Sequence, residues 1–358
     1  MSLTSILSDQ KNQELRDKFK TEFLTPSFNL NAELKAPPLT NNYGIVGTAF
    51  DYLLRFYLQY HNKDTCIQRD FWVADDSFEQ LCLHLNSTTK QEVSTGFRRD
   101  KVFKIQDILA IITNQYEDTK INYNNFIENG VITDELICNT IFLAKLDGFY
   151  RARLIDENFD NYNHEDIKDI KSLISLVDNK NFQAKEKCYL NPTFGAGSSL
   201  VRGADADLII DNTLIDIKVT KNLKLDINYI NQVLGYYILS LIGGVNSNPN
   251  DRPIENIGIY FARHGELLTI PIVEFGDTQK FENFKEWFIS YLSSQRGKLL
   301  DMMRLKEETQ KEDKKTKSNL QKKTPTKKTS TESKKTKTVT KSKPAITKKE
   351  DNSEKESK

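Results

Sequence analysis

The chain of 358 residues is predicted to fold as an α/β domain, with a mixed central sheet flanked by helices. Two observations support this. Apolar residues follow a helical period until about residue 181, and short β-like runs replace that period after Lys187. A long apolar helix pattern then separates the third of these runs from the fourth, an order that favours a mixed α/β sheet. We also expect a helical insert before the sheet and a disordered basic tail after it.

The elements before the sheet are predicted to be helical. Residues 1–42 would hold an amphipathic helix at 9–24 and a loop at 26–42, which contains Pro37-Pro38. The first core helix is expected at 43–61. The insert at 62–186 is expected to be helical throughout, with helices near 78–85, 90–116, 134–156 and 164–177.

The core at 187–304 is predicted to contain the sheet. We expect strands at 188–190, 206–210, 213–219, 257–262 and 267–270, and helices at 226–242 and 279–305. The first of these helices would stop at Gly243-Gly244. Residues 195–199, Gly-Ala-Gly-Ser-Ser, are expected to form a flexible turn, although such a loop could also approach a phosphate.

Composition excludes several classes of protein. The longest apolar run, at 233–243, is far shorter than a bilayer-spanning segment, and residues 1–10 lack a basic flank with an apolar stretch. Neither a membrane nor secretion is indicated. The four cysteines form no Cys-x-x-Cys pair, so we expect free thiols in a reducing, cytoplasmic compartment. The four histidines form no zinc motif, and no phosphate-binding P-loop sequence occurs.

Charge is segregated along the chain. Of the 51 Lys and Arg and the 50 Asp and Glu, residues 305–358 hold 18 and 9, so this tail carries +9 and the body before it carries −8. The tail contains too few apolar residues to fold, and we expect it to be disordered. It is either a solubility element or an electrostatic arm that holds phosphate backbones.

A candidate catalytic hairpin lies at residues 206–219. Two apolar runs are joined by Asp211-Asn212, a pair that tolerates the positive φ of a tight turn. Counting outward from a two-residue turn places Asp207 opposite Asp216, with Cβ atoms roughly 4.5 to 5.5 Å apart. Two facing carboxylates repel each other unless a cation lies between them, and a divalent metal ion would fill that position.

The lysine at the end of this hairpin is expected beside the metal. Side chains alternate along a strand, so Asp216 and Lys218 share one face while the apolar residues between and around them face the core. An ordinary hairpin with a polar outer face is the alternative. In that case Asp205, which the same count places opposite Lys218, would simply form a surface ion pair.

These residues resemble a known nuclease pattern. Asp207, followed by Asp216-Ile217-Lys218 on the next strand, resembles the D…(D/E)-x-K core of the PD-(D/E)xK nuclease superfamily, with Ala206 where the name-giving proline would stand. Residues 232–236, Gln-Val-Leu-Gly-Tyr, look like the Q-x-x-x-Y motif that follows the catalytic lysine in RecB-type nucleases. The i, i+4 spacing of that motif puts its glutamine and tyrosine on one helix face.

A further match lies upstream, in the helix at 43–61. Residues 47–51, Gly-Thr-Ala-Phe-Asp, resemble the G-x-x-x-H motif of the same nucleases, with Asp51 replacing histidine. The resemblance covers residues 43–61 and 187–270. Some RecB-like relatives carry an iron–sulfur cluster on three cysteines after the core, whereas the last cysteine here is Cys188. No iron–sulfur cluster is therefore expected.

The resemblance implies a restriction-endonuclease-like core and metal-dependent phosphodiester hydrolysis, with DNA as the expected substrate, in repair or in defence against foreign DNA. Asp207, Asp216 and the main-chain carbonyl of Ile217 would bind one or two Mg²⁺ (or Mn²⁺) ions, which prefer oxygen ligands. Asp51 would be a further ligand.

The resemblance also implies roles for three other side chains. Lys218 would orient or deprotonate the attacking water and offset charge on the phosphate. Gln232 and Tyr236 would position the substrate or the lysine.

Nucleic acid would also need local positive charge on an acidic body. Candidate contacts are the basic clusters Arg98, Arg99, Lys101 and Lys104; Arg151 and Arg153; and Lys221 and Lys224. Two alternatives to the nuclease remain at this point. One is a catalytically inactive nucleic-acid-binding module of the same fold, and the other is a sequence-specific restriction endonuclease.

Overall fold

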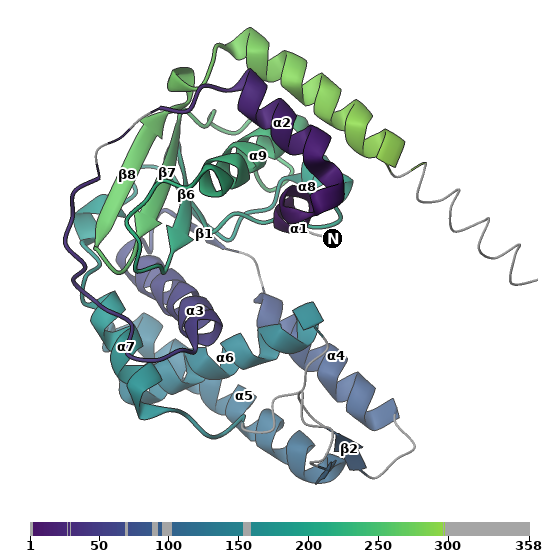
Figure 1. Ribbon diagram of the computed structural model, residues 1–358. Coiled ribbons are helices and arrows are strands. Elements are labelled where there is room, and N and C mark those ends of the chain that lie inside the picture. The colour runs from purple at the N-terminus through teal and green to yellow at the C-terminus, as the bar shows by residue number, and fades with distance from the viewer. Residues whose placement is uncertain are drawn as a thin grey trace, which may run out of the picture. The chain divides into compact units, whose positions relative to one another are not determined.

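Short runs of β-branched and other apolar residues form a six-stranded mixed sheet in the order β1-β4-β5-β6-β7-β8 (Figure 1). The computed structural model describes residues 3–26, 28, 30–68, 71–87, 92–94, 102–152, 159–295 and 297. The strands are β1 (Cys66–Gln68), β4 (Cys188–Leu190), β5 (Leu208–Ile210), β6 (Thr213–Lys218), β7 (Asn256–Phe261) and β8 (Glu266–Pro271). The pairs β1-β4 and β6-β7 are parallel, and the other three neighbouring pairs are antiparallel.

Helices line both faces of the sheet. The helices associated with one face are α3 (Tyr43–His61), α4 (Val73–Ser87), α5 (Ile105–Asn129), α6 (Asp134–Ala152) and α7 (His164–Ile174). Those on the other face are α1 (Leu3–Ser8), α2 (Gln13–Glu22), α8 (Gly195–Leu200), α9 (Ile227–Gly243) and the helical residues 278–295. The described residues also form three short 3-10 helices, η1 (Gln10–Asn12), η2 (Asn179–Asn181) and η3 (Ile272–Glu274). Figure 1 shows α3 and α9 on opposite sides of the strands.

The alternation of side chains along β6 separates two hydrophobic clusters. Ile215 is buried with α3 and the helices behind it, whereas Leu214 is buried with α9 and α1. Asp216 and Lys218 have the same parity as Leu214, so their side chains leave β6 on the α9 face. The parallel connection from β6 through α9 to β7 therefore places α9 directly over the charged end of β6.

Several elements differ from the sequence predictions. The insert is not helical throughout, because β1 joins the main sheet as an edge strand and β2 (Glu92–Ser94) pairs with β3 (Val102–Lys104). A helix from residue 90 was therefore a wrong prediction, and α5 begins only at Ile105. The N-terminal helix starts earlier than expected and is interrupted at Asp9, whose carboxylate accepts a hydrogen bond from the main chain of Lys11.

The glycine-rich segment at 195–199 is helical and not a flexible turn. It forms most of α8, which packs closely on α9. Glycine permits this approach, because a Cβ at Gly197 would overlap the main chain of Leu239, and one at Gly243 would overlap the main-chain oxygen of Phe194. Tertiary contact thus decides the structure of a segment whose composition favours a loop.

Residues 1–297 form one compact unit, and the expected tail at 305–358 lies outside the described residues. So do residues 153–156 of the helix expected at 134–156. No described helix is long and apolar enough to span a bilayer. The four cysteines are free thiols, and Cys66 lies directly opposite Cys188 in the β1-β4 pair.

Candidate functional site

The β5-β6 hairpin has the register predicted from its two-residue turn. Ile210 pairs with Thr213 and Leu208 pairs with Ile215, which leaves residues 211 and 212 as the turn. Asp211 has a φ of 50°, in the left-handed region, and its carboxylate accepts hydrogen bonds from the main-chain N–H groups of residues 185–187. This turn fixes which residues stand at the open end of the hairpin.

At that open end, a hydrogen bond to the Asp207 side chain takes the place of main-chain pairing between β5 and β6. β5 begins only at Leu208, and Asp207 Oδ2 accepts a 2.7 Å hydrogen bond from the N–H of Ile217. The N–H and C=O of one strand residue point to the same strand edge. The Ile217 carbonyl therefore also faces the edge where β5 has ended, beside the Asp207 carboxylate.

Asp216 is buried on the face of β6 that α9 covers. It is 2% exposed, and its Oδ2 lies 2.6 Å from Lys218 Nζ. Burial raises the pKa of Asp216, the Lys218 charge opposes that rise, and the Asp51 charge adds to it. Burial also raises the pKa of Asp207 well above its usual value, and the charges of Asp216 and Asp51 raise it further. The three carboxylates thus share one electrostatic environment.

The helix above this strand end holds the lysine in place. Lys218 Nζ donates a 2.9 Å hydrogen bond to Gln232 Oε1, and Gln232 Nε2 donates to the Tyr236 hydroxyl at 3.2 Å. The ring of Tyr229 lies 4.7 Å from Nζ. Burial, with the Asp207 charge second, raises the pKa of Tyr236, so its hydroxyl stays protonated at neutral pH. Asp216, Lys218, Gln232 and Tyr236 therefore form one connected chain of polar groups.

Asp51 approaches from α3, against the opposite face of the sheet. An open cleft of about 330 Å³ is lined by α3 residues including Gly47, Thr48 and Asp51, and by Asp207 and Ile217. Asp51 is not free in this cleft, because its Oδ2 lies 2.6 Å from Arg55 Nη2, one helical turn along α3. The structure therefore brings Asp51 and the hairpin together at one cleft, while its role as a metal ligand stays a prediction.

The donors at the cleft suit a metal ion only in part. Among the described residues, no three His, Cys, Asp or Glu side chains form a complete metal-binding group. Asp207 and the Ile217 carbonyl at the cleft, and Asp216 on the α9 face of the same strand, nevertheless offer oxygen ligands, and burial destabilises both carboxylates. Magnesium ordinarily keeps several waters and takes only one or two protein carboxylates, together with phosphate oxygens of the substrate. The set present fits that mode of binding and does not fit a closed protein cage.

The predicted nucleic-acid contacts are scattered. Lys104 is exposed beside the N-terminus of α5, and Lys221 and Lys224 are exposed in the segment after β6. The side chain of Arg151, at the end of α6, is not described. Arg98, Arg99, Lys101 and Arg153 lie outside the described residues. Of these candidates, only Lys221 and Lys224 follow directly from the strand that carries the site.

Sequence inspection missed two residues of the site. Arg55 neutralises Asp51, and the i, i+4 spacing of the two on α3 was the signal that could have revealed the pair. Tyr229 covers the Lys218 ammonium group from the helix turn before Gln232. No known protein family, curated protein or solved structure matches the chain, so the interpretation of the site depends on its own geometry.

Proposed function

We propose that the chain is a metal-dependent nuclease of the PD-(D/E)xK kind, which hydrolyses phosphodiester bonds in DNA. The observation that supports this most is the placement of Lys218. Its ammonium group is held between Asp216 and Gln232, at the end of the hairpin where Asp207 and the Ile217 carbonyl face the cleft. A lysine that served only as a surface charge would not need the buried Asp216 carboxylate and the Gln232 side-chain amide to fix its position.

In this proposal Lys218 orients the attacking water and offsets the negative charge that develops on the phosphate. Gln232 holds the ammonium group from α9, and Tyr236 orients the Gln232 amide, so little reorganisation is needed during the reaction. Asp207 and Asp216 would hold a Mg²⁺ ion, with the Ile217 carbonyl as a neutral ligand. That ion would polarise the scissile phosphate and lower the pKa of a bound water.

Asp51 and Arg55 play a supporting part in the proposal. The positive charge of Arg55 lowers the repulsion between Asp51 and the two hairpin carboxylates when no metal is bound. The Asp51 carboxylate, which lines the same cleft, would be a further oxygen ligand for the ion, and Arg55 would keep a positive charge beside it.

A catalytically inactive nucleic-acid-binding module is the second candidate. It is favoured by the incomplete metal group and by the ion pair that already occupies Asp51. The chain of contacts from Asp216 to Tyr236 argues for the enzyme, because simple binding would not require it. A sequence-specific restriction endonuclease is not favoured by any described element.

Incubation of the purified protein with labelled nucleic acids tests the proposal. Circular and linear DNA and RNA, single-stranded and double-stranded, would each be incubated with Mg²⁺, with Mn²⁺ and with EDTA. We expect metal-dependent cleavage of DNA that EDTA abolishes. Protein carrying Asp216→Asn, purified in the same way, excludes a contaminating nuclease. Binding without cleavage in every metal would favour the inactive module.

A further inference from the structure

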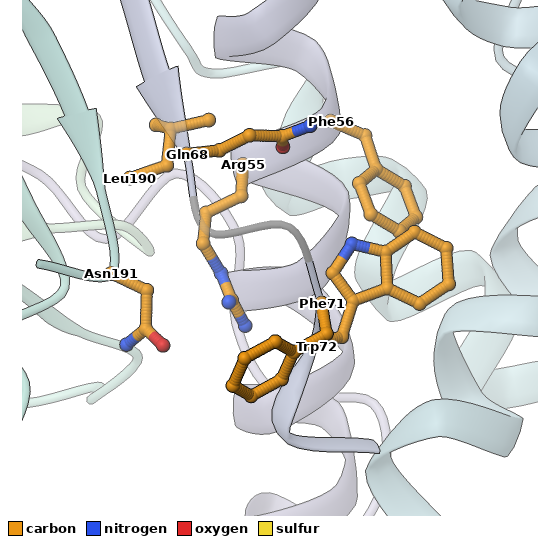
Figure 2. A pocket seen from close by; sticks show the side chains of 7 residues that line it. All are labelled: Arg55, Phe56, Gln68, Phe71, Trp72, Leu190 and Asn191. Atoms are coloured by element: carbon orange, nitrogen blue, oxygen red, sulfur yellow. The ribbon is translucent and has the colours of Figure 1, made fainter. Parts of the chain in front are cut away.

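A small pocket with both polar and apolar walls opens beside the candidate site, on the side of α3 that faces the sheet edge. It is lined by Arg55 and Phe56 of α3, Gln68 of β1, Phe71 and Trp72 before α4, and Leu190 and Asn191 at the end of β4. Figure 2 shows the Arg55 side chain leaving α3 and ending between Asn191 and Phe71. None of the roles proposed above uses Phe71 or Asn191.

Two residues that line the pocket, Arg55 and Asn191, contact residues of the candidate site. Arg55 forms the ion pair with Asp51 through Nη2. Asn191, which has a positive φ of 52°, donates its main-chain N–H to the main-chain oxygen of Asp207 at 2.9 Å. A group bound in this pocket would therefore lie next to the nucleotide whose phosphate occupies the cleft.

The pocket presents unused hydrogen-bonding groups. The Arg55 side chain is 11% exposed, and its guanidinium packs 4.4 Å from the centre of the Tyr52 ring. Within the described residues, no acceptor is bonded to Arg55 Nη1, and none of the donors reaches Asn191 Oδ1. A partly desolvated guanidinium with a donor to spare favours an acceptor on a ligand.

The rim of the pocket offers a flat aromatic surface. Phe71 is 49% exposed, although phenylalanine is usually buried. The enclosed part of the pocket is about 20 Å³, enough for one water-sized group and too small for an aromatic ring. A planar ligand would therefore lie on Phe71 and insert only an edge substituent, such as a carbonyl oxygen, toward Arg55.

We propose that this pocket binds one unpaired nucleobase of the substrate strand, stacked on Phe71 with its edge toward Arg55 and Asn191. The proposal rests on the proposed nuclease function and specifies its substrate. A base cannot stack there while it is paired in a duplex, so the preferred substrate is single-stranded DNA or a frayed end. Stacking of bases on aromatic side chains tolerates any sequence, because each base has an aromatic face.

Binding of two oligonucleotides tests this inference. Fluorescence anisotropy in Ca²⁺ would measure the affinity for a short oligothymidylate and for a matched strand of abasic sites. We expect Phe71→Ala to weaken oligothymidylate binding by about tenfold. The same variant should leave binding of the abasic strand unchanged, and Phe71→Trp should restore the oligothymidylate affinity. Leu83→Ala, which removes an exposed apolar side chain of α4 outside the pocket, is the matched control.

The outcomes distinguish a failure of the base-binding proposal from a failure of the nuclease proposal. If Phe71→Ala weakens both strands equally, or neither, the pocket does not bind a base, whereas metal-dependent cleavage by the wild type would still support the enzyme. If the wild type neither binds nor cleaves either strand, the base pocket is wrong, and the nuclease proposal also fails if duplex and circular DNA are not cleaved. A melting temperature for each variant shows whether it is folded.

Discussion

At the scale of single residues, the candidate site is defined by carboxylates that the fold keeps close together. Besides burial, the Asp51 charge raises the pKa of both Asp207 and Asp216 and the Asp216 charge raises that of Asp207 further, while Lys218 opposes both rises and Arg55 pairs with Asp51. A sequence selected only for stability gains nothing from such an arrangement. The sequence predicted the register of the β5-β6 hairpin, because a two-residue turn fixes which residues pair. It did not reveal Tyr229, whose contact with Lys218 depends on the packing of α9 over β6, and it missed Arg55 although the i, i+4 spacing from Asp51 was visible.

The first prediction concerns pH and Asp207. A carboxyl group with a raised pKa in the native state binds more protons than it does in the unfolded chain, so its contribution to stability falls as pH rises. In EDTA, the free energy of unfolding should decrease as pH rises from about 4 through the native pKa of Asp207. Asp207→Asn should flatten this decrease and raise stability at neutral pH. Urea unfolding at a series of pH values measures the effect.

Asp211 is the matched control, because its pKa shift has the opposite sign. Burial raises its pKa, but the three main-chain N–H donors at the turn and Arg252 lower it below the usual value. Its contribution is therefore present at neutral pH and is lost as pH falls through the native pKa. Asp211→Asn should lower neutral stability by about 1 kcal/mol. Equal pH profiles for the two variants would contradict the electrostatic description of the site.

The second prediction concerns metal-linked stability. Mg²⁺ that binds only the native state should raise the unfolding free energy by about 2.7 kcal/mol when its concentration is 100 times the dissociation constant. Asp216→Asn should lose much of this gain, because it removes a charged ligand. Lys218→Ala should keep it, because the lysine acts on water and phosphate. Melting temperatures with Mg²⁺ and with EDTA provide the comparison. If both variants lose the Mg²⁺-dependent stabilisation equally, the assignment of Asp216 to the metal and of Lys218 to water and phosphate is wrong.

At the scale of elements, local patterns predicted the second half of the chain better than the insert. The strands at 188–190 and 213–218 and the helix at 227–243 lie within a few residues of their expected bounds. β1 was missed because it has only three residues and is defined by its pairing with β4, far along the sequence. α8 was missed because its glycines serve close packing on α9 and not flexibility.

The third prediction tests this packing. Gly243→Ala should destabilise the protein by about 1–3 kcal/mol, because the new methyl group overlaps the main chain of Phe194 and must push α8 from α9. Gly148→Ala, in α6, is the control. No heavy atom lies within 4 Å of its added Cβ, so the helix should gain about 0.5–1 kcal/mol. If chemical denaturation shows the same change for both variants, the contact between α8 and α9 is not as close as described.

At the scale of the whole molecule, the sheet separates two sets of side chains, and each set contributes polar groups near the end of β6. α3 supplies Asp51 from one face, and α9 supplies Gln232 and Tyr236 from the other. The sequence predicted an α/β fold with a mixed sheet, and the structure confirms it. The restriction-endonuclease-like identity of that core stays a prediction. So does the nuclease activity, because chemistry at a site cannot be inferred from fold class alone.

The fourth prediction concerns the basic tail at 305–358, which carries +9 beside a body of −8. Ending the chain at residue 304 should weaken nucleic-acid binding at low salt and reduce the salt dependence of the affinity, because fewer counterions are released. The melting transition of the remaining chain should be unchanged. Affinities at several salt concentrations test this. Equal affinities for both forms at low salt would assign the tail to solubility alone.

The rate of DNA cleavage in Mg²⁺ by the wild type and by Lys218→Ala tests the central claim most directly. We expect the wild type to cleave a labelled single strand, with no cleavage in EDTA, and Lys218→Ala to be slower by at least about 10²-fold. Lys168→Ala, which removes an exposed lysine of α7 paired with Glu165, should cleave at the wild-type rate. Lys218→Ala cleaving as fast as the wild type, or a folded wild type that cleaves no nucleic acid with any metal, would contradict the account.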